Sequence, residues 1–139
     1  MMVLVDTSVW SLFLRRQSRH LSPEQARAKQ ELAELITEGL AQIIGPIRQE
    51  LLSGIREEAQ YRALRERLRA FSDVSLTTED YEQAAEACNH CRARGISGSA
   101  VDFLICASAM RRSWPVFATA RDFRSYARLI PLRLYVSRF

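Results

Sequence analysis

The sequence contains only three cysteines, a single lysine and no long hydrophobic run. An odd, small number of cysteines argues against a disulfide framework. No apolar run approaches the roughly 20 residues that a membrane-spanning helix needs. The N-terminal segment MMVLVDTSVWSLFL is apolar, but it lacks a basic leader and carries an aspartate, so it does not resemble a signal peptide. We therefore expect a cytoplasmic protein that makes no contact with membranes.

Cys88 and Cys91 form a C-x-x-C pair, the spacing found in many zinc sites. A structural zinc site needs further ligands, and no second C-x-x-C or H-x-H pair follows. We interpret Cys88 and Cys91 as small apolar residues on the buried face of a helix, and Cys106 in the same way.

The length and composition are those of one globular domain. The 139 residues are 47% hydrophobic and 26% charged, which excludes a disordered or fibrous chain. We expect a single domain over residues 1–139. The net charge of +4 comes from arginine, since Lys29 is the only lysine. Arginine pairs well with phosphate, but genome base composition explains the arginine content more simply, so charge alone does not establish nucleic-acid binding.

Short apolar segments alternate with amphipathic ones along the chain. Segments 2–5, 41–44, 74–76, 116–118 and 134–136 have the character of buried strands, and the stretches between them have the periodicity and caps of helices. Strands joined by single helices imply right-handed crossovers and parallel pairing. We predict an α/β fold with a central parallel sheet of four to five short strands and helices on both faces.

Four carboxylates are expected at one edge of this sheet. Asp6 follows the first strand, Glu50 lies in the helix after the second, Asp102 begins the helix before the fourth, and Asp122 follows the fourth. Functional groups gather at the carboxyl ends of parallel strands. Converging carboxylates repel one another unless a cation neutralises them, and oxygen ligands favour magnesium or manganese. A metal-binding acidic pocket is the economical interpretation.

Each carboxylate also has a purely structural explanation. Asp6 and Asp122 could cap their helices, and Asp102, three residues after Ser99, could complete a capping box. Glu50 could lie on the exposed flank of an amphipathic helix. The joint pattern favours the metal site, because independent caps have no reason to fall at the same sheet edge.

Four stretches of the chain carry a recognisable combination of motifs: 3–10 (VLVDTSVW), 45–54 (GPIRQELLSG), 102–109 (DFLICASA) and 121–123 (RDF). In order and spacing they resemble the PIN-domain family, and in particular its VapC-type toxins. The resemblance extends over essentially the whole chain. It implies a small α/β fold, a magnesium or manganese ion held by Asp6, Glu50 and Asp102, and endoribonuclease activity.

The fourth motif departs from the family pattern. A threonine and an aspartate or asparagine often precede its acidic-Phe pair, and here Ala118 and Ala120 occupy those positions. Asp122 is retained as a fourth catalytic acid, either as a direct ligand or acting through water and its neighbours.

The resemblance also implies partners. RNA would be hydrolysed by a metal-activated water, and a cognate antitoxin and a second copy of the chain would bind the protein. Ser8 or Thr7 could bind a metal-bound water, although helix capping explains both equally well. The basic residues beside the expected pocket are candidates for substrate binding: Arg15, Arg16, Arg19, Arg121 and Arg124. Trp10, Leu14, Leu32 and Leu35 could form an interface, although core packing is the default for such residues.

Two alternatives remain open. The altered fourth motif favours a PIN-like binding module for RNA or protein that has lost catalysis, whereas the other three acids favour an enzyme. A receiver-like or haloacid-dehalogenase-like phosphoryl-transfer domain would also place an aspartate after the first strand. The second of these needs another aspartate two residues later, where this chain has Ser8.

Overall fold

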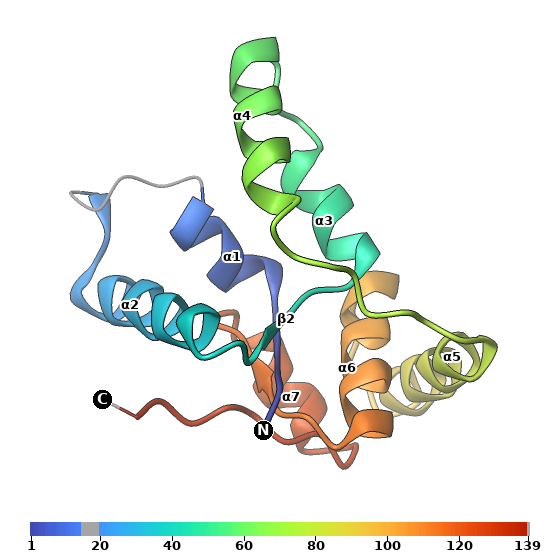
Figure 1. Ribbon diagram of the computed structural model, residues 1–139. Coiled ribbons are helices and arrows are strands. Elements are labelled where there is room, and N and C mark those ends of the chain that lie inside the picture. Colours follow the sequence, from blue (N-terminus) through green and yellow to red (C-terminus); the bar gives the residue numbers. More distant parts are fainter. Residues whose placement is uncertain (15–19, 139) are drawn as a thin grey trace.

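We analysed a computed structural model of the chain, which describes residues 1–14 and 20–138 (Figure 1). Helices and strands alternate over most of its length, as the sequence predicts. Their order is β1 (Val3–Val5), α1 (Thr7–Leu14), α2 (Pro23–Thr37), β2 (Ala41–Gln42), α3 (Gly45–Leu52), α4 (Glu58–Leu68), α5 (Thr78–Arg92), α6 (Ala100–Arg112), β3 (Val116–Phe117) and α7 (Asp122–Ala127).

The sheet is parallel, with the order β2-β1-β3. Val3 pairs with Ala41 on one side of β1, and Leu4 pairs with Val116 on the other. Figure 1 shows α1 and α2 on one side of the sheet and α5 and α6 on the other. The parallel α/β fold is therefore confirmed, and β1 is its central strand.

The predicted number of strands was wrong, because the described residues form three strands and not four to five. Segments 74–76 and 134–136 were expected to be strands. Each only touches the sheet edge, through the single parallel bridges Ile43–Asp73 and Val116–Leu134. Beyond each of these bridges the chain turns away from the sheet. An apolar segment becomes a strand only where a neighbour pairs with several of its residues.

Local capping residues mark where the helices begin and end. Ser22 and Gln25 form a reciprocal capping box at the start of α2. At α5 the Asp80 carboxylate accepts a hydrogen bond from the Thr77 backbone N–H at 2.8 Å. Gly95, just beyond the end of α5, has a φ of 83°, a conformation that glycine adopts without strain.

The apolar side chains form one core around β1. Trp10, Leu32 and Leu35 are almost completely buried in it, so core packing is the correct interpretation of these residues. Cys91 and Cys106 are buried as expected, whereas Cys88 is only half-buried. Over the described residues, no helix is both long enough and apolar enough to cross a bilayer.

Two buried carboxylates tie outlying segments to this core. Asp80, at the start of α5, pairs with Arg111 and Arg112 at the end of α6, both at 2.8 Å. Glu31, in α2, accepts hydrogen bonds from the Tyr135 hydroxyl and, at 3.0 Å, from Arg138 Nε. The contacts of Asp80 join α5 to α6. The contacts of Glu31 hold the C-terminal segment against α2.

Candidate active site

Asp6 lies directly after the central strand and is only 6% exposed. Its backbone N–H donates to the Phe117 carbonyl at 2.8 Å, so β3 holds it in place. Its carboxylate oxygen Oδ2 accepts from the Ser8 backbone N–H at 3.1 Å. Asp6 therefore caps α1 through Oδ2. Its other carboxylate oxygen, Oδ1, takes no part in this cap and is available for a ligand at the carboxyl edge of the sheet.

The environment of Asp6 disfavours its charged form. Burial raises the pKa of the Asp6 carboxyl, and the negative charge of Asp102 raises it further, although hydrogen bonds from Ser8 oppose the shift. Asp102, which is far from Asp6 in sequence, is therefore close enough in the fold to contribute to this shift. A buried carboxylate near a second carboxylate is the arrangement that a bound cation would stabilise.

Glu50 is an exposed residue of α3, as expected for one flank of an amphipathic helix. Its Oε1 accepts a hydrogen bond from the Thr7 hydroxyl at 2.8 Å. The Ser8 hydroxyl accepts from the Thr119 backbone N–H at 3.0 Å. Helix capping was one of two explanations left open for these hydroxyls. The hydrogen bonds that they form link the first motif to distant ones.

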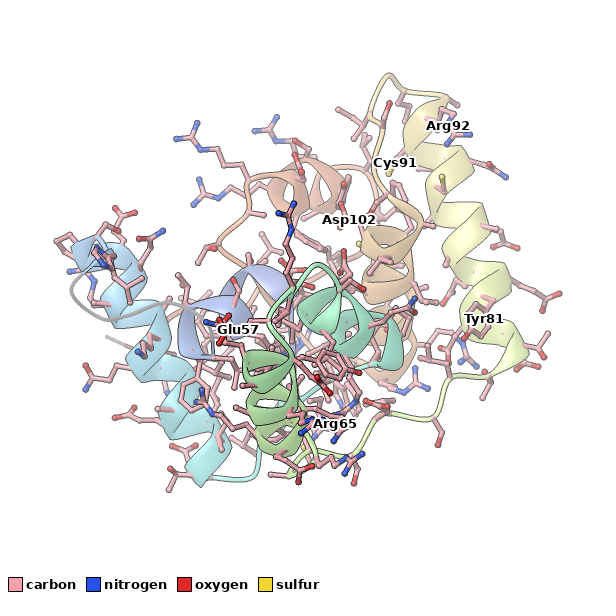
Figure 2. All side chains as sticks on the ribbon, turned by 90° about the horizontal axis from the view of Figure 1, so that it is seen from above. Glu57, Arg65, Tyr81, Cys91, Arg92 and Asp102 are labelled. Carbon is pink, nitrogen blue, oxygen red and sulfur yellow. The ribbon has the colours of Figure 1, made fainter. Side chains whose placement is uncertain are left out.

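Asp102 lies in the first turn of α6, near the middle of the molecule in Figure 2. Its backbone N–H donates to the Ser99 hydroxyl at 3.1 Å, so the predicted cap is present. Its Oδ2 accepts from the Tyr126 hydroxyl at 2.7 Å. The sequence reasoning missed Tyr126, although this residue follows Asp122 by one helical turn.

Asp122 is exposed in the first turn of α7, after the N-cap residue Arg121. Its negative charge acts on Tyr126, whose pKa is raised above its usual value mainly by burial and by the hydrogen bond to Asp102. Arg121 and Arg124 are also exposed. Arg124 lines a cleft together with Arg27 and Phe117. Three other candidate basic residues lie outside the described residues: Arg15, Arg16 and Arg19.

Hydrogen bonds thus link Glu50 to the residue after Asp6, and Asp102 to α7, which begins at Asp122. Within residues 1–14 and 20–138, however, no three acidic, histidine or cysteine side chains are arranged as a ready metal cluster. Asp102 contributes to the raised pKa of Asp6, and Glu50 accepts a hydrogen bond from Thr7, the residue after Asp6. All the available ligands are oxygens, which suits magnesium or manganese rather than a softer metal.

Comparison with known proteins decides the family. The sequence model of the PIN domain matches residues 3–129. The chain belongs to the PIN domain family. The resemblance drawn from the four motifs is therefore confirmed at the level of the family, and the match contains all four candidate acids.

Solved structures of similar fold agree with a PIN domain. The crystal structure of FitAcB from Neisseria gonorrhoeae has a TM-score of 0.74 at 22% identity, covering 98% of both chains. VapBC2 from Rickettsia felis, bound to a DNA fragment from its promoter, has a TM-score of 0.70 at 14% identity, covering 97% of this chain and 98% of that one. VapBC-1 from nontypeable Haemophilus influenzae has a TM-score of 0.71 at 14% identity, covering 97% of each chain. Comparison with curated protein sequences gives no match.

Proposed function

We propose that this PIN domain is a divalent-metal-dependent endoribonuclease and the toxin of a toxin-antitoxin pair. One observation supports the proposal: Asp6 is buried directly after the central strand, Asp102 contributes to its raised pKa, and the next residue, Thr7, donates a hydrogen bond to Glu50. Burial of a carboxylate near a second one is unfavourable, and a bound cation would compensate for it.

Asp6, Glu50 and Asp102 would hold the cation, and Asp122 would complete the site. When bound, the cation activates water for attack on an RNA phosphodiester and stabilises charge in the transition state. The protein contributes preorganised ligands. One oxygen of each of the three carboxylates is fixed by a hydrogen bond, from Ser8 N–H, the Thr7 hydroxyl and the Tyr126 hydroxyl respectively. Ligands that are already oriented lose less conformational entropy on binding.

The substrate and partners follow from the same proposal. RNA would approach the acidic edge beside the exposed Arg121 and Arg124, whose charges attract phosphate. The similar folds include VapBC and FitAcB structures, which supports an antitoxin as the partner. We further propose a homodimer, a single domain over residues 1–139 and a cytoplasmic location.

RNA cleavage by purified, antitoxin-free protein tests the proposal. Cleavage should require Mg²⁺ or Mn²⁺, stop with EDTA and be abolished in Asp6→Asn. A matched control is Asp73→Asn, because the Asp73 carboxylate is 41% exposed and already pairs with Arg48. This control should cleave RNA as the wild type does.

The alternative function is a binding module, which Ala118 and Ala120 in the fourth motif favour. It predicts no cleavage of any RNA with either cation and no heat of cation binding in calorimetry. RNA binding that is indifferent to Asp6→Asn would establish that alternative. Cleavage that survives EDTA would contradict the metal-dependent mechanism.

A further inference from the structure

The hydroxyl of Tyr126 is held against one of the candidate metal ligands. The residue is 1% exposed, and its hydroxyl donates to Asp102 Oδ2 at 2.7 Å. The aromatic rings of Phe103 and Phe123 pack against it, with centroid distances of 4.9 and 5.4 Å. Because these contacts fix the ring on two sides, the hydroxyl has little freedom to turn away from Asp102.

The loop before α6 is shaped around this hydroxyl. A Cβ added to Gly98 would lie 2.2 Å from the Tyr126 hydroxyl oxygen and 2.8 Å from the ring carbon Cζ. A Cβ does not lie this close to a non-bonded heavy atom in real structures. Gly98 also lacks the positive φ that accounts for Gly95. We conclude that glycine occurs at position 98 because the tyrosine needs the space.

The same tyrosine connects Asp102 to the fourth motif. Tyr126 follows Asp122 by four residues within α7, so the two side chains share one face of the helix. Phe123, the residue of the RDF motif that the fold buries, packs against the tyrosine ring. The position of α7 is therefore coupled to the orientation of Asp102.

We propose that Tyr126 is a positioning residue for the metal site. Its hydroxyl occupies Asp102 Oδ2 and leaves Oδ1 for the divalent cation, and Gly98 provides the room for this contact. The inference rests on the proposed function, because it concerns the same site. A partner that donates to a metal-binding carboxylate fixes the direction of its remaining lone pairs, and loss of such a partner typically weakens metal binding about 10- to 100-fold.

Tyr126→Phe tests this, because it removes the hydroxyl and keeps the ring. The matched control is Tyr135→Phe, which removes a hydroxyl that also donates to a carboxylate, but at Glu31. Titration calorimetry with Mn²⁺ on the full chain should show at least about tenfold weaker binding for Tyr126→Phe and unchanged binding for Tyr135→Phe. Cleavage by Tyr126→Phe should recover when the Mn²⁺ concentration is raised.

A second variant perturbs the same contact from the side of the loop. Gly98→Ala keeps the tyrosine but displaces its hydroxyl, so it should weaken Mn²⁺ binding as well. Wild-type affinity in both Tyr126→Phe and Gly98→Ala would overturn the inference and leave the nuclease proposal standing. Equal weakening in Tyr135→Phe would also overturn it, because the effect would then follow general stability. A wild-type protein that neither binds Mn²⁺ nor cleaves RNA would remove the proposed function and this inference together.

Discussion

Replacement of Asp80 by asparagine should destabilise the protein severely. The Asp80 side chain is fully buried, whereas the side chains of Arg111 and Arg112 are 31% and 20% exposed. Arg112 binds both carboxylate oxygens, at 2.8 and 2.9 Å. Removing one partner of a buried ion pair costs about 3–5 kcal/mol. Because both arginines still reach water, we expect the lower end, about 3 kcal/mol, or a fall in Tm of about 10 °C for a chain of this size.

Urea unfolding followed by circular dichroism would measure this loss. The control is Glu58→Gln, which breaks an ion pair with Arg62 whose side chains are 77% and 64% exposed. Exposed pairs contribute little, so this control should unfold as the wild type does. If Asp80→Asn loses less than about 1 kcal/mol, or no more than Glu58→Gln, the buried pair does not stabilise the fold as we argue.

The loss in Asp80→Asn should also depend on pH. The hydrogen bond from Arg112 holds the pKa of Asp80 well below its usual range in the folded protein. In the unfolded chain an aspartate titrates near about pH 3.9. The stabilisation is therefore complete above that pH and disappears as the pH falls toward the folded pKa. The difference between the wild type and Asp80→Asn should be constant near neutral pH and should shrink in acid.

Three further substitutions have clear expected outcomes. Asp6→Asn should raise the metal-free stability at neutral pH, because it removes a buried charge whose pKa is raised; a lower Tm would contradict this. Ser113→Gly should stabilise by about 0.5–1 kcal/mol, since Ser113 has a φ of 59° at the end of α6, and equal urea midpoints would refute it. Glu31→Gln should speed amide hydrogen exchange over residues 135–138, because Glu31 binds Tyr135, Ser137 and Arg138; unchanged exchange would contradict that role.

Features encoded by neighbouring residues were predictable from the sequence. The cap at Ser99 appears where it was expected, since it depends on residues three positions apart. The positions of Asp6 and Asp102 at the ends of their elements followed from the same local patterns. The carboxyl edge of a parallel sheet then explained why they interact.

Features that depend on distant partners were not predictable. The prediction of strands at 74–76 and 134–136 was wrong, because the chain forms only a single bridge with the sheet at each place. The Thr7 and Ser8 hydroxyls found partners 43 and 111 residues away rather than in their own helix. Tyr126 carried a usable signal in its one-turn spacing from Asp122. The contact with Asp102, however, requires the packing of α7 beside α6, which no local pattern encodes.

The distribution of thiols makes the chain suitable for labelling at a single position. Cys91 and Cys106 are completely buried, and burial raises the pKa of both thiols, so they are poor nucleophiles. Cys88 is half-buried and lines a groove between α5 and α6 beside Tyr81. A maleimide dye should therefore attach at Cys88 without mutagenesis. Its emission would report on any molecule that covers this groove.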